Sequence, residues 1–218
     1  MVGFERFGKQ GAVPEGVGER VEDYDQQLAT IRLISHLQPP SAAAPIWLER
    51  FSPYFSQREA LGITNVRPEP AYTYVYPQFI DLDRVAYFFS YDAVQTVPAA
   101  YYAEIGDCVE IWQEQWRSSQ PPFLVYQKGK GRLTVTDARR TGPSRIFSFG
   151  ELGAAIYEYC VPTARGITQI IDHLNRELAL EVDGETVQDS LDEFHSLGLM
   201  LEENQSHLSL ALPVNSNW

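Results

Sequence analysis

The chain has 218 residues, is 44% hydrophobic and 12% aromatic, and carries a formal net charge of −12. This composition is typical of a globular protein and excludes a disordered one, and the acidic balance argues against a general nucleic-acid binder. The sequence has neither an apolar run of about eighteen residues nor a signal-peptide core, so we expect a cytoplasmic protein that contacts no membrane. Cys108 and Cys160 each fall within an apolar helical pattern, which favours buried thiols over a disulfide.

Three parts are predicted along the chain, within an α+β fold. Residues 1–22 are rich in glycine and show no periodicity, which predicts a flexible segment. Residues 23–120 are predicted to form a first domain and residues 121–218 a second. The boundary is placed there because the serines and prolines of residues 118–122 interrupt the preceding helical pattern.

The first domain begins with a predicted helix. Apolar residues recur every three or four positions from Tyr24 to Leu37, and Pro39 and Pro40 forbid its continuation. Further along this domain, the patterns predict a strand at 46–48, a strand bearing Tyr72, Tyr74 and Tyr76, an apolar helix at 81–91, and an aromatic helix at 98–116.

The second domain is predicted to begin with strands and continue with helices. Alternation and a glycine-rich turn predict a hairpin of residues 123–126 and 132–137, with a third strand at 144–149. Three helices follow, with predicted N-terminal caps at Ser148, Thr163 and Asp183, and Gly198 is predicted to end the third helix. A closing hairpin at 199–212 completes a winged-helix pattern.

No catalytic centre or metal site is predicted from the sequence. It contains no phosphate-binding glycine motif, no nucleophile elbow and no zinc-type cluster, and its four histidines lack ligand spacing. His173 and His195 fall on the two later helices and could approach one another, although ordinary surface histidines are the commoner case.

The region 128–145 is a basic strip on an acidic protein. It contains six basic residues against a single aspartate: Lys128, Lys130, Arg132, Arg139, Arg140 and Arg145, with Asp137. We expect a peptide to add as a strand to the hairpin edge and to contact Lys128, Lys130, Arg132, Thr134 and Thr136. The alternative is a charged edge that only protects the protein against aggregation.

DNA binding is the third hypothesis and the least favoured. A winged helix that binds DNA places basic residues on its third helix, since neutralised phosphates supply most of the affinity. The third predicted helix here carries acidic residues instead, namely Glu185, Asp189, Asp192 and Glu193.

Several ordered motifs resemble the carboxyl-terminal part of the cobalamin-dependent radical SAM C-methyltransferases that mature ribosomally made peptides (RiPPs). These motifs are HLQPP at 36–40, LERFSPYF at 48–55, GITNVRP at 62–68, YTYVYP at 72–77, LGLMLEE at 197–203 and LSLALP at 208–213. The resemblance implies the last helix and strand of a barrel, a helical aromatic segment, and a winged-helix-like domain similar to the elements that hold leader peptides.

The same resemblance implies that this chain has no activity alone. The family needs three cysteines to hold a [4Fe–4S] cluster, and Cys108 and Cys160 cannot replace them. Cobalamin and most of the S-adenosylmethionine site belong to the part of the family that precedes Asp23, so no cofactor is expected in this chain. Glu49 and Arg50 would then be the remnant of a site at a strand end.

The implied partner is a precursor or leader peptide, or a protein that carries the missing domains. In the second case the chain would be one subunit of a split methyltransferase. A decayed gene product that still folds is a further alternative.

Overall fold

A computed structural model of the chain describes residues 21–43, 47–93, 99–179 and 181–214. Most of the predicted flexible segment, residues 1–20, lies outside these ranges, whereas Val21 and Glu22 already belong to a helix. The chain divides into two compact units. Unit 1 consists of Met1–Leu28 and Pro40–Gln113, and unit 2 consists of Ala29–Pro39 and Glu114–Trp218.

Two of the predicted helices run across the division between these units. They are α2 (Val21–Ile34) and α6 (Ala99–Arg117). Within unit 1, Tyr24 of α2 packs edge-on against the rings of Tyr101 and Tyr102 of α6, at centroid distances of 6.0 and 5.2 Å. The apolar periodicity therefore identified both helices correctly.

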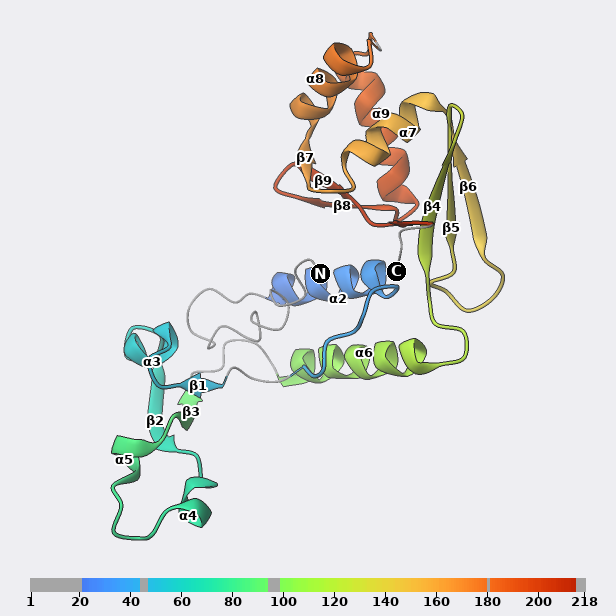
Figure 1. The fold of residues 1–218 in the computed structure, drawn as a ribbon. Coiled ribbons are helices and arrows are strands. Elements are labelled where there is room, and N and C mark those ends of the chain that lie inside the picture. Colours follow the sequence, from blue (N-terminus) through green and yellow to red (C-terminus); the bar gives the residue numbers. More distant parts are fainter. Residues whose placement is uncertain (1–20, 44–46, 94–98, 180, 215–218) are drawn as a thin grey trace. The chain divides into compact units, whose positions relative to one another are not determined.

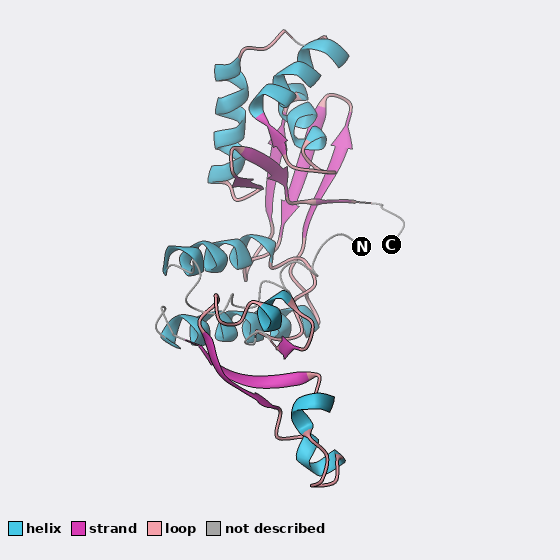
Figure 2. Ribbon diagram, turned by 90° about the vertical axis from the view of Figure 1, so that its left-hand side faces the viewer, coloured by secondary structure: helices cyan, strands magenta, loops and turns pink. Residues whose placement is uncertain are grey.

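The rest of unit 1 is built on a small antiparallel sheet (Figure 2). Its elements are β1 (Leu48–Glu49), α3 (Pro53–Ser56), β2 (Ile63–Pro68), α4 (Tyr72–Val75), α5 (Leu82–Val85) and β3 (Phe88–Ala93). β3 lies between β1 and β2, and both of these strands pair with it in antiparallel fashion. The buried cluster of this sheet consists of Leu48, Ile63, Ala86 and Phe89.

Two predictions for unit 1 were wrong in secondary structure. The tyrosine repeat forms helix α4, in which the Tyr76 amide donates to the Tyr72 carbonyl. The Tyr72 hydroxyl accepts from the amides of Tyr87 and Phe88 at 2.9 and 3.1 Å, so Tyr72 satisfies two backbone amides at the start of β3. The predicted helix at 81–91 is instead α5 followed by β3, because pairing with two strands satisfies the backbone of β3.

The predicted strand at 46–48 is observed as β1, and Ile46 lies outside the described residues. β1 pairs only with β3 in a three-stranded sheet, and the described strands close no barrel.

Unit 2 combines two sheets with three helices (Figure 1). Its strands are β4 (Leu124–Gly129), β5 (Arg132–Asp137), β6 (Arg145–Phe149), β7 (Arg165–Gly166), β8 (Met200–Glu203), β9 (Ser206–Ser209) and β10 (Leu212–Pro213). Its helices are α7 (Glu151–Tyr159), α8 (Ile167–Glu177) and α9 (Gly184–Ser196). The strand orders are β10-β4-β5-β6 and β7-β9-β8. Together the two units confirm an α+β fold.

The core of unit 2 lies where the three helices meet the strands. It contains side chains with no exposed surface from every helix: Ile156, Tyr157, Ile170, Leu174, Val187, Leu191 and Phe194. The Tyr157 hydroxyl donates to the Leu199 carbonyl and accepts from the Ala211 amide, both at 3.0 Å. This one buried tyrosine therefore connects α7 to both ends of the β8–β9 hairpin.

The structure confirms two of the predicted helix ends. The Asp183 carboxylate accepts from the Thr186 amide at 2.8 Å at the start of α9. Gly198 has φ +70° just after α9, a conformation that glycine adopts at little cost.

The other two predicted caps were wrong. Ser148 belongs to β6, and α7 begins after Gly150 without a side-chain cap. α8 begins after Gly166 rather than at Thr163, because residues 165–166 first pair as β7 with β9.

Both cysteines are free thiols. Cys160 is fully buried, and burial raises the pKa of its thiol to about 12. Cys108 is half-buried.

None of the described helices is long and apolar enough to cross a bilayer.

Candidate functional site

The hairpin edge lies on a different strand from the one predicted. Arg132, Thr134 and Thr136 were placed on an edge strand, but β5 is paired with β4 on one side and β6 on the other. A peptide cannot add to β5, because both rows of its backbone groups face neighbouring strands. Among the described strands, the order β10-β4-β5-β6 places two-residue β10 at one edge of the sheet and the longer strand β6 at the other. The prediction was wrong because a hairpin pattern does not show on which side a third strand pairs.

The edge strand β6 has one exposed face and one covered face. Ile146 is 70% exposed, Ser148 is exposed as well, and Phe149 is buried. Phe149 packs against Phe194 of α9 with ring centroids 4.7 Å apart, which anchors β6 to the core. The strand therefore presents an open backbone edge on a fixed support.

Two predicted contact residues lie one strand away from this edge. Thr136 is the cross-strand partner of Ile146, and Thr134 is the partner of Ser148. Partners in an antiparallel pair project to the same face of a sheet. Thr134 and Thr136 therefore extend the exposed face of β6 inward, together with Arg132, which follows the same alternation on β5.

Part of the basic strip is structural rather than available to a partner. Arg139 and Asp137 form an ion pair with an N–O distance of 2.9 Å, and their side chains are 6% and 1% exposed. Arg139 also donates to the carbonyls of Leu33 and Gly198, at 2.6 and 2.9 Å. It therefore holds three segments of unit 2 together from the inside.

The buried carboxylate of Asp137 also accepts from Arg145, at 2.6 Å. Burial alone would favour its neutral form, but the hydrogen bonds and charge of Arg139, with the bond from Arg145, outweigh this effect. They hold the pKa of the Asp137 carboxyl well below its usual range.

The remaining cations of the strip are exposed. Lys128 pairs with Glu158 of α7, whereas Lys130, Arg132 and Arg140 lie at the surface. Lys128 and Arg132 line a shallow hollow of about 450 Å³, together with Glu151, Glu158, Tyr159 and His173. Because its charges are mixed, this hollow favours neither a purely acidic nor a purely basic ligand.

Glu49 and Arg50 are held in structural contacts of unit 1. Arg50 donates to the carbonyls of Ala86 and Asp83, both at 2.6 Å, and its guanidinium lies 4.9 Å from the centre of the Phe89 ring. The Tyr87 hydroxyl donates to Glu49 at 3.3 Å. These contacts fasten β1 to the segment that leads into β3.

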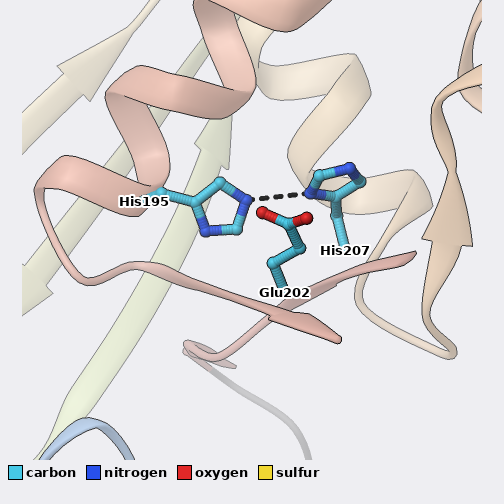
Figure 3. Close-up of side chains that lie close together, drawn as sticks. All are labelled: His195, Glu202 and His207. Atoms are coloured by element: carbon cyan, nitrogen blue, oxygen red, sulfur yellow. Dashed lines mark hydrogen bonds between the residues drawn. The ribbon is translucent and has the colours of Figure 1, made fainter. Parts of the chain in front are cut away.

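The structure also brings together a histidine cluster that the sequence reasoning did not find (Figure 3). It consists of His195 near the end of α9, Glu202 on β8 and His207 on β9. The Nε2 atom of His195 lies 2.8 Å from the Nδ1 atom of His207, and one ligand atom from each of the three residues lies within 4.8 Å of the others. The Glu202 carboxylate points toward the pair of nitrogens that the dashed line joins.

The two histidines differ in their surroundings. His207 is 5% exposed, and burial together with the neighbouring His195 lowers the pKa of its ring. His195 is half-buried, and its Nδ1 atom lies 3.3 Å from the Met200 carbonyl. His173, which was considered as a possible neighbour of His195, stacks on Tyr159 at 3.9 Å.

The turn between β8 and β9 is the feature that brings this cluster together. Asn204 and Gln205 form it, and both have positive φ, of 50° and 60°, as in a two-residue hairpin turn. A turn at these two residues makes Glu202 and His207 cross-strand partners. Spacing along the chain alone does not show it, because the register of the hairpin decides which side chains meet.

Comparison with protein-family models, with curated proteins and with solved structures gives no match for this chain. Its function is therefore inferred from the edge strand, the charges around it and the sequence motifs.

Proposed function

We propose that the chain is a non-catalytic peptide-binding module of ribosomal peptide maturation, in which β6 accepts an extended peptide as an added strand. The observation that carries this proposal is the open edge of β6 in the strand order β10-β4-β5-β6. Its Ile146 side chain is 70% exposed, although exposed apolar residues are usually kept away from open edges.

Strand addition would supply affinity through the backbone and specificity through side chains. The unpaired amides and carbonyls of β6 would pair with the peptide backbone, and Ile146 and Ser148 would contact alternate peptide side chains. The nearby exposed cations Lys130, Arg132 and Arg140 favour an acidic peptide and would speed its association.

The arrangement of unit 2 supports a winged-helix-like domain. α7, α8 and α9 are followed by the β8–β9 hairpin, and the short strand β7 between α7 and α8 pairs with β9. The exposed acids Glu185, Asp189, Asp192 and Glu193 of α9 oppose DNA phosphates, so peptide binding is favoured over DNA binding.

The sequence motifs support an origin in the carboxyl-terminal part of radical SAM C-methyltransferases. On this proposal, this chain contributes the binding of a leader peptide. Glu49 and Arg50 would be what remains of a strand-end site.

Calorimetric titration with a synthetic precursor leader, taken from a gene beside this one, tests the proposal. We expect binding that the substitution Ile146→Asp weakens at least tenfold, because it places an acid on the edge that receives an acidic peptide. Ile111→Asp is the matched control, since Ile111 is a 53% exposed isoleucine of unit 1.

Two results would contradict the proposal. One is the absence of heat at high micromolar peptide concentration with folded protein. The other is an equal loss of affinity in the two isoleucine variants.

A second candidate function is supported by unit 1. Five of its large apolar side chains are at least 68% exposed: Trp47 68%, Phe51 85%, Tyr74 91%, Val75 72% and Phe79 85%. Side chains of this kind in such numbers favour a protein contact, as in a subunit of a split methyltransferase.

Co-purification with a neighbouring protein that carries the cysteine triad tests this second function. We expect the pair to associate, and Trp47→Ser together with Phe79→Ser to abolish the association. A pair that fails to associate, or one that associates unchanged with the double variant, would contradict it.

A further inference from the structure

The histidine cluster at the end of α9 belongs to neither proposed function. It joins three elements of unit 2, since His195 lies on α9, Glu202 on β8 and His207 on β9. We propose that His195, Glu202 and His207 bind one divalent transition-metal ion, with zinc as the expected ion.

The distances are close to those of a coordination site. Imidazole nitrogens bind zinc at about 2.0–2.1 Å, which separates two ligands of a tetrahedral ion by about 3.4 Å. His195 Nε2 and His207 Nδ1 are 2.8 Å apart, so the two rings need to separate by only a fraction of an ångström. All three ligand atoms lie within 4.8 Å of one another, and Glu202 is exposed and free to close the remaining gap by rotation.

The hydrogen bond behind His195 leaves the correct nitrogen for the metal. Its Nδ1 atom lies 3.3 Å from the Met200 carbonyl, and a carbonyl can only accept, so Nδ1 carries the proton there. Nε2 is then unprotonated and accepts the hydrogen bond from His207 Nδ1. Metal binding therefore displaces the Nδ1 proton of His207, which moves to the Nε2 atom of that ring or to solvent. A backbone carbonyl that orients a ligating histidine in this way is the usual outer-sphere arrangement of protein metal sites.

The hairpin register fixes the other two ligands on one face. Glu202 is the cross-strand partner of His207, and partners of this kind project to the same side of the sheet. Arg165 is the partner of His207 on its other side, but its guanidinium lies over the Tyr159 ring, 4.5 Å from the ring centre.

The charge around the cluster also suits a cation. Asp192 on α9 is a second carboxylate that acts electrostatically on His207. Two neutral imidazoles and one carboxylate form a donor set that suits zinc and related divalent ions, and three protein ligands leave a fourth position for water or for a partner side chain.

Binding would connect the end of α9 to the β8–β9 hairpin. Because an ion that binds only the folded state stabilises it by mass action, the melting temperature of unit 2 should rise with zinc concentration. This effect is independent of any peptide on β6, so it can be tested without a known peptide partner.

The experiment uses the full chain without a histidine tag, freed of metal by a chelator and titrated with zinc in a calorimeter. We expect one zinc ion per chain, and a visible spectrum of tetrahedral ligation when Co²⁺ replaces zinc. Loss of an outer-sphere partner already weakens metal binding about 10–100-fold, so Glu202→Gln and His195→Gln, which each remove a ligand, should each weaken zinc binding at least about tenfold.

Two matched controls separate this site from adventitious binding. Glu203→Gln changes the next exposed acid of β8, and His173→Gln changes a histidine outside the cluster. Both controls should bind zinc as the unaltered chain does. The proposal is overturned if the chain binds no zinc at high micromolar concentration, or if the cluster variants bind it as tightly as the two controls.

Discussion

The core of unit 2 contains large aromatic side chains that are fully buried, whereas unit 1 has several aromatic side chains that are almost fully exposed. Phe194 and Tyr157 of unit 2 have no exposed surface, while Phe79 and Tyr74 of unit 1 are 85% and 91% exposed. Apolar surface of that size is costly to leave in water. Unit 2 therefore has a buried aromatic core of its own, and under the second proposed function a partner protein would cover the exposed rings of unit 1.

The largest expected effect comes from the core of unit 2. Phe194→Ala should lower the free energy of unfolding by about 4 kcal/mol, because it removes a fully buried ring and leaves a cavity. Phe79→Ala in unit 1 should change it by less than about 0.5 kcal/mol. Urea unfolding of the two variants measures both values, and equal losses would remove the contrast between the units.

The next effect tests whether Arg139 is structural or a peptide contact. Arg139→Ala should lower the free energy of unfolding by about 3–4 kcal/mol, since it leaves the buried Asp137 without its main partner. Arg140→Ala, the neighbouring exposed arginine, should have little effect on stability. An Arg139 variant as stable as the Arg140 variant would mean that the buried network contributes little.

The two units should also differ in how their stability depends on pH, because all four histidines lie in unit 2. Burial of His36 lowers the pKa of its ring to about 4 from 6.5, and its Nε2 donates to the Leu210 carbonyl at 2.8 Å. Below about pH 6.5, His36 binds a proton in the unfolded chain but stays neutral in the folded chain until the pH approaches 4. Stability is therefore full above about pH 6.5, falls by about 3 kcal/mol toward pH 4, and levels off below that value.

Hydrogen exchange followed by mass spectrometry from pH 7 to pH 5 checks this prediction, once the intrinsic pH dependence of exchange is subtracted. Protection should decrease in unit 2 before it does in unit 1, and His36→Gln should flatten the decrease. The Asp137 carboxyl does not contribute to the pH dependence between pH 7 and pH 5. Its ordinary pKa is 3.8 and its pKa in the folded chain is lower still, so it is ionised in both states over this range. A simultaneous decrease in both units, unchanged in the variant, would contradict the account.

The smallest expected effect lies in unit 1. Tyr72→Phe removes the hydroxyl that accepts from the amides of Tyr87 and Phe88. It should lower stability by about 1 kcal/mol, because both donors lie near solvent and can regain water. Tyr74→Phe, on the same helix with a 91% exposed ring, is the control and should be neutral in the same thermal unfolding assay.

Sequence reasoning succeeded where local signals agree with the tertiary structure. Apolar periodicity located the long helices, and the chemistry of Asp183 and Gly198 located the two ends of α9. It failed at the tyrosine repeat, where spacing by two suits a strand but the Tyr72 hydroxyl is needed beside β3. Short elements of this kind are decided by tertiary contacts rather than by propensity.

The candidate sites could be predicted only in part for the same reason. The basic strip was visible, but which of its cations are buried depends on contacts such as that of Arg139 with Leu33, 106 positions away. The edge position of β6 depends on strand order, and the meeting of His195 with His207 depends on hairpin register. Neither property is contained in a local pattern.

The most direct test of the central claim is amide hydrogen exchange of the full chain with and without a leader peptide. Strand addition at β6 predicts that the peptide slows exchange in β6, residues Arg145–Phe149, while exchange in β5 and in the strands of unit 1 stays unchanged. Bound peptide that leaves β6 unprotected, or that protects only unit 1, would contradict strand addition at this edge.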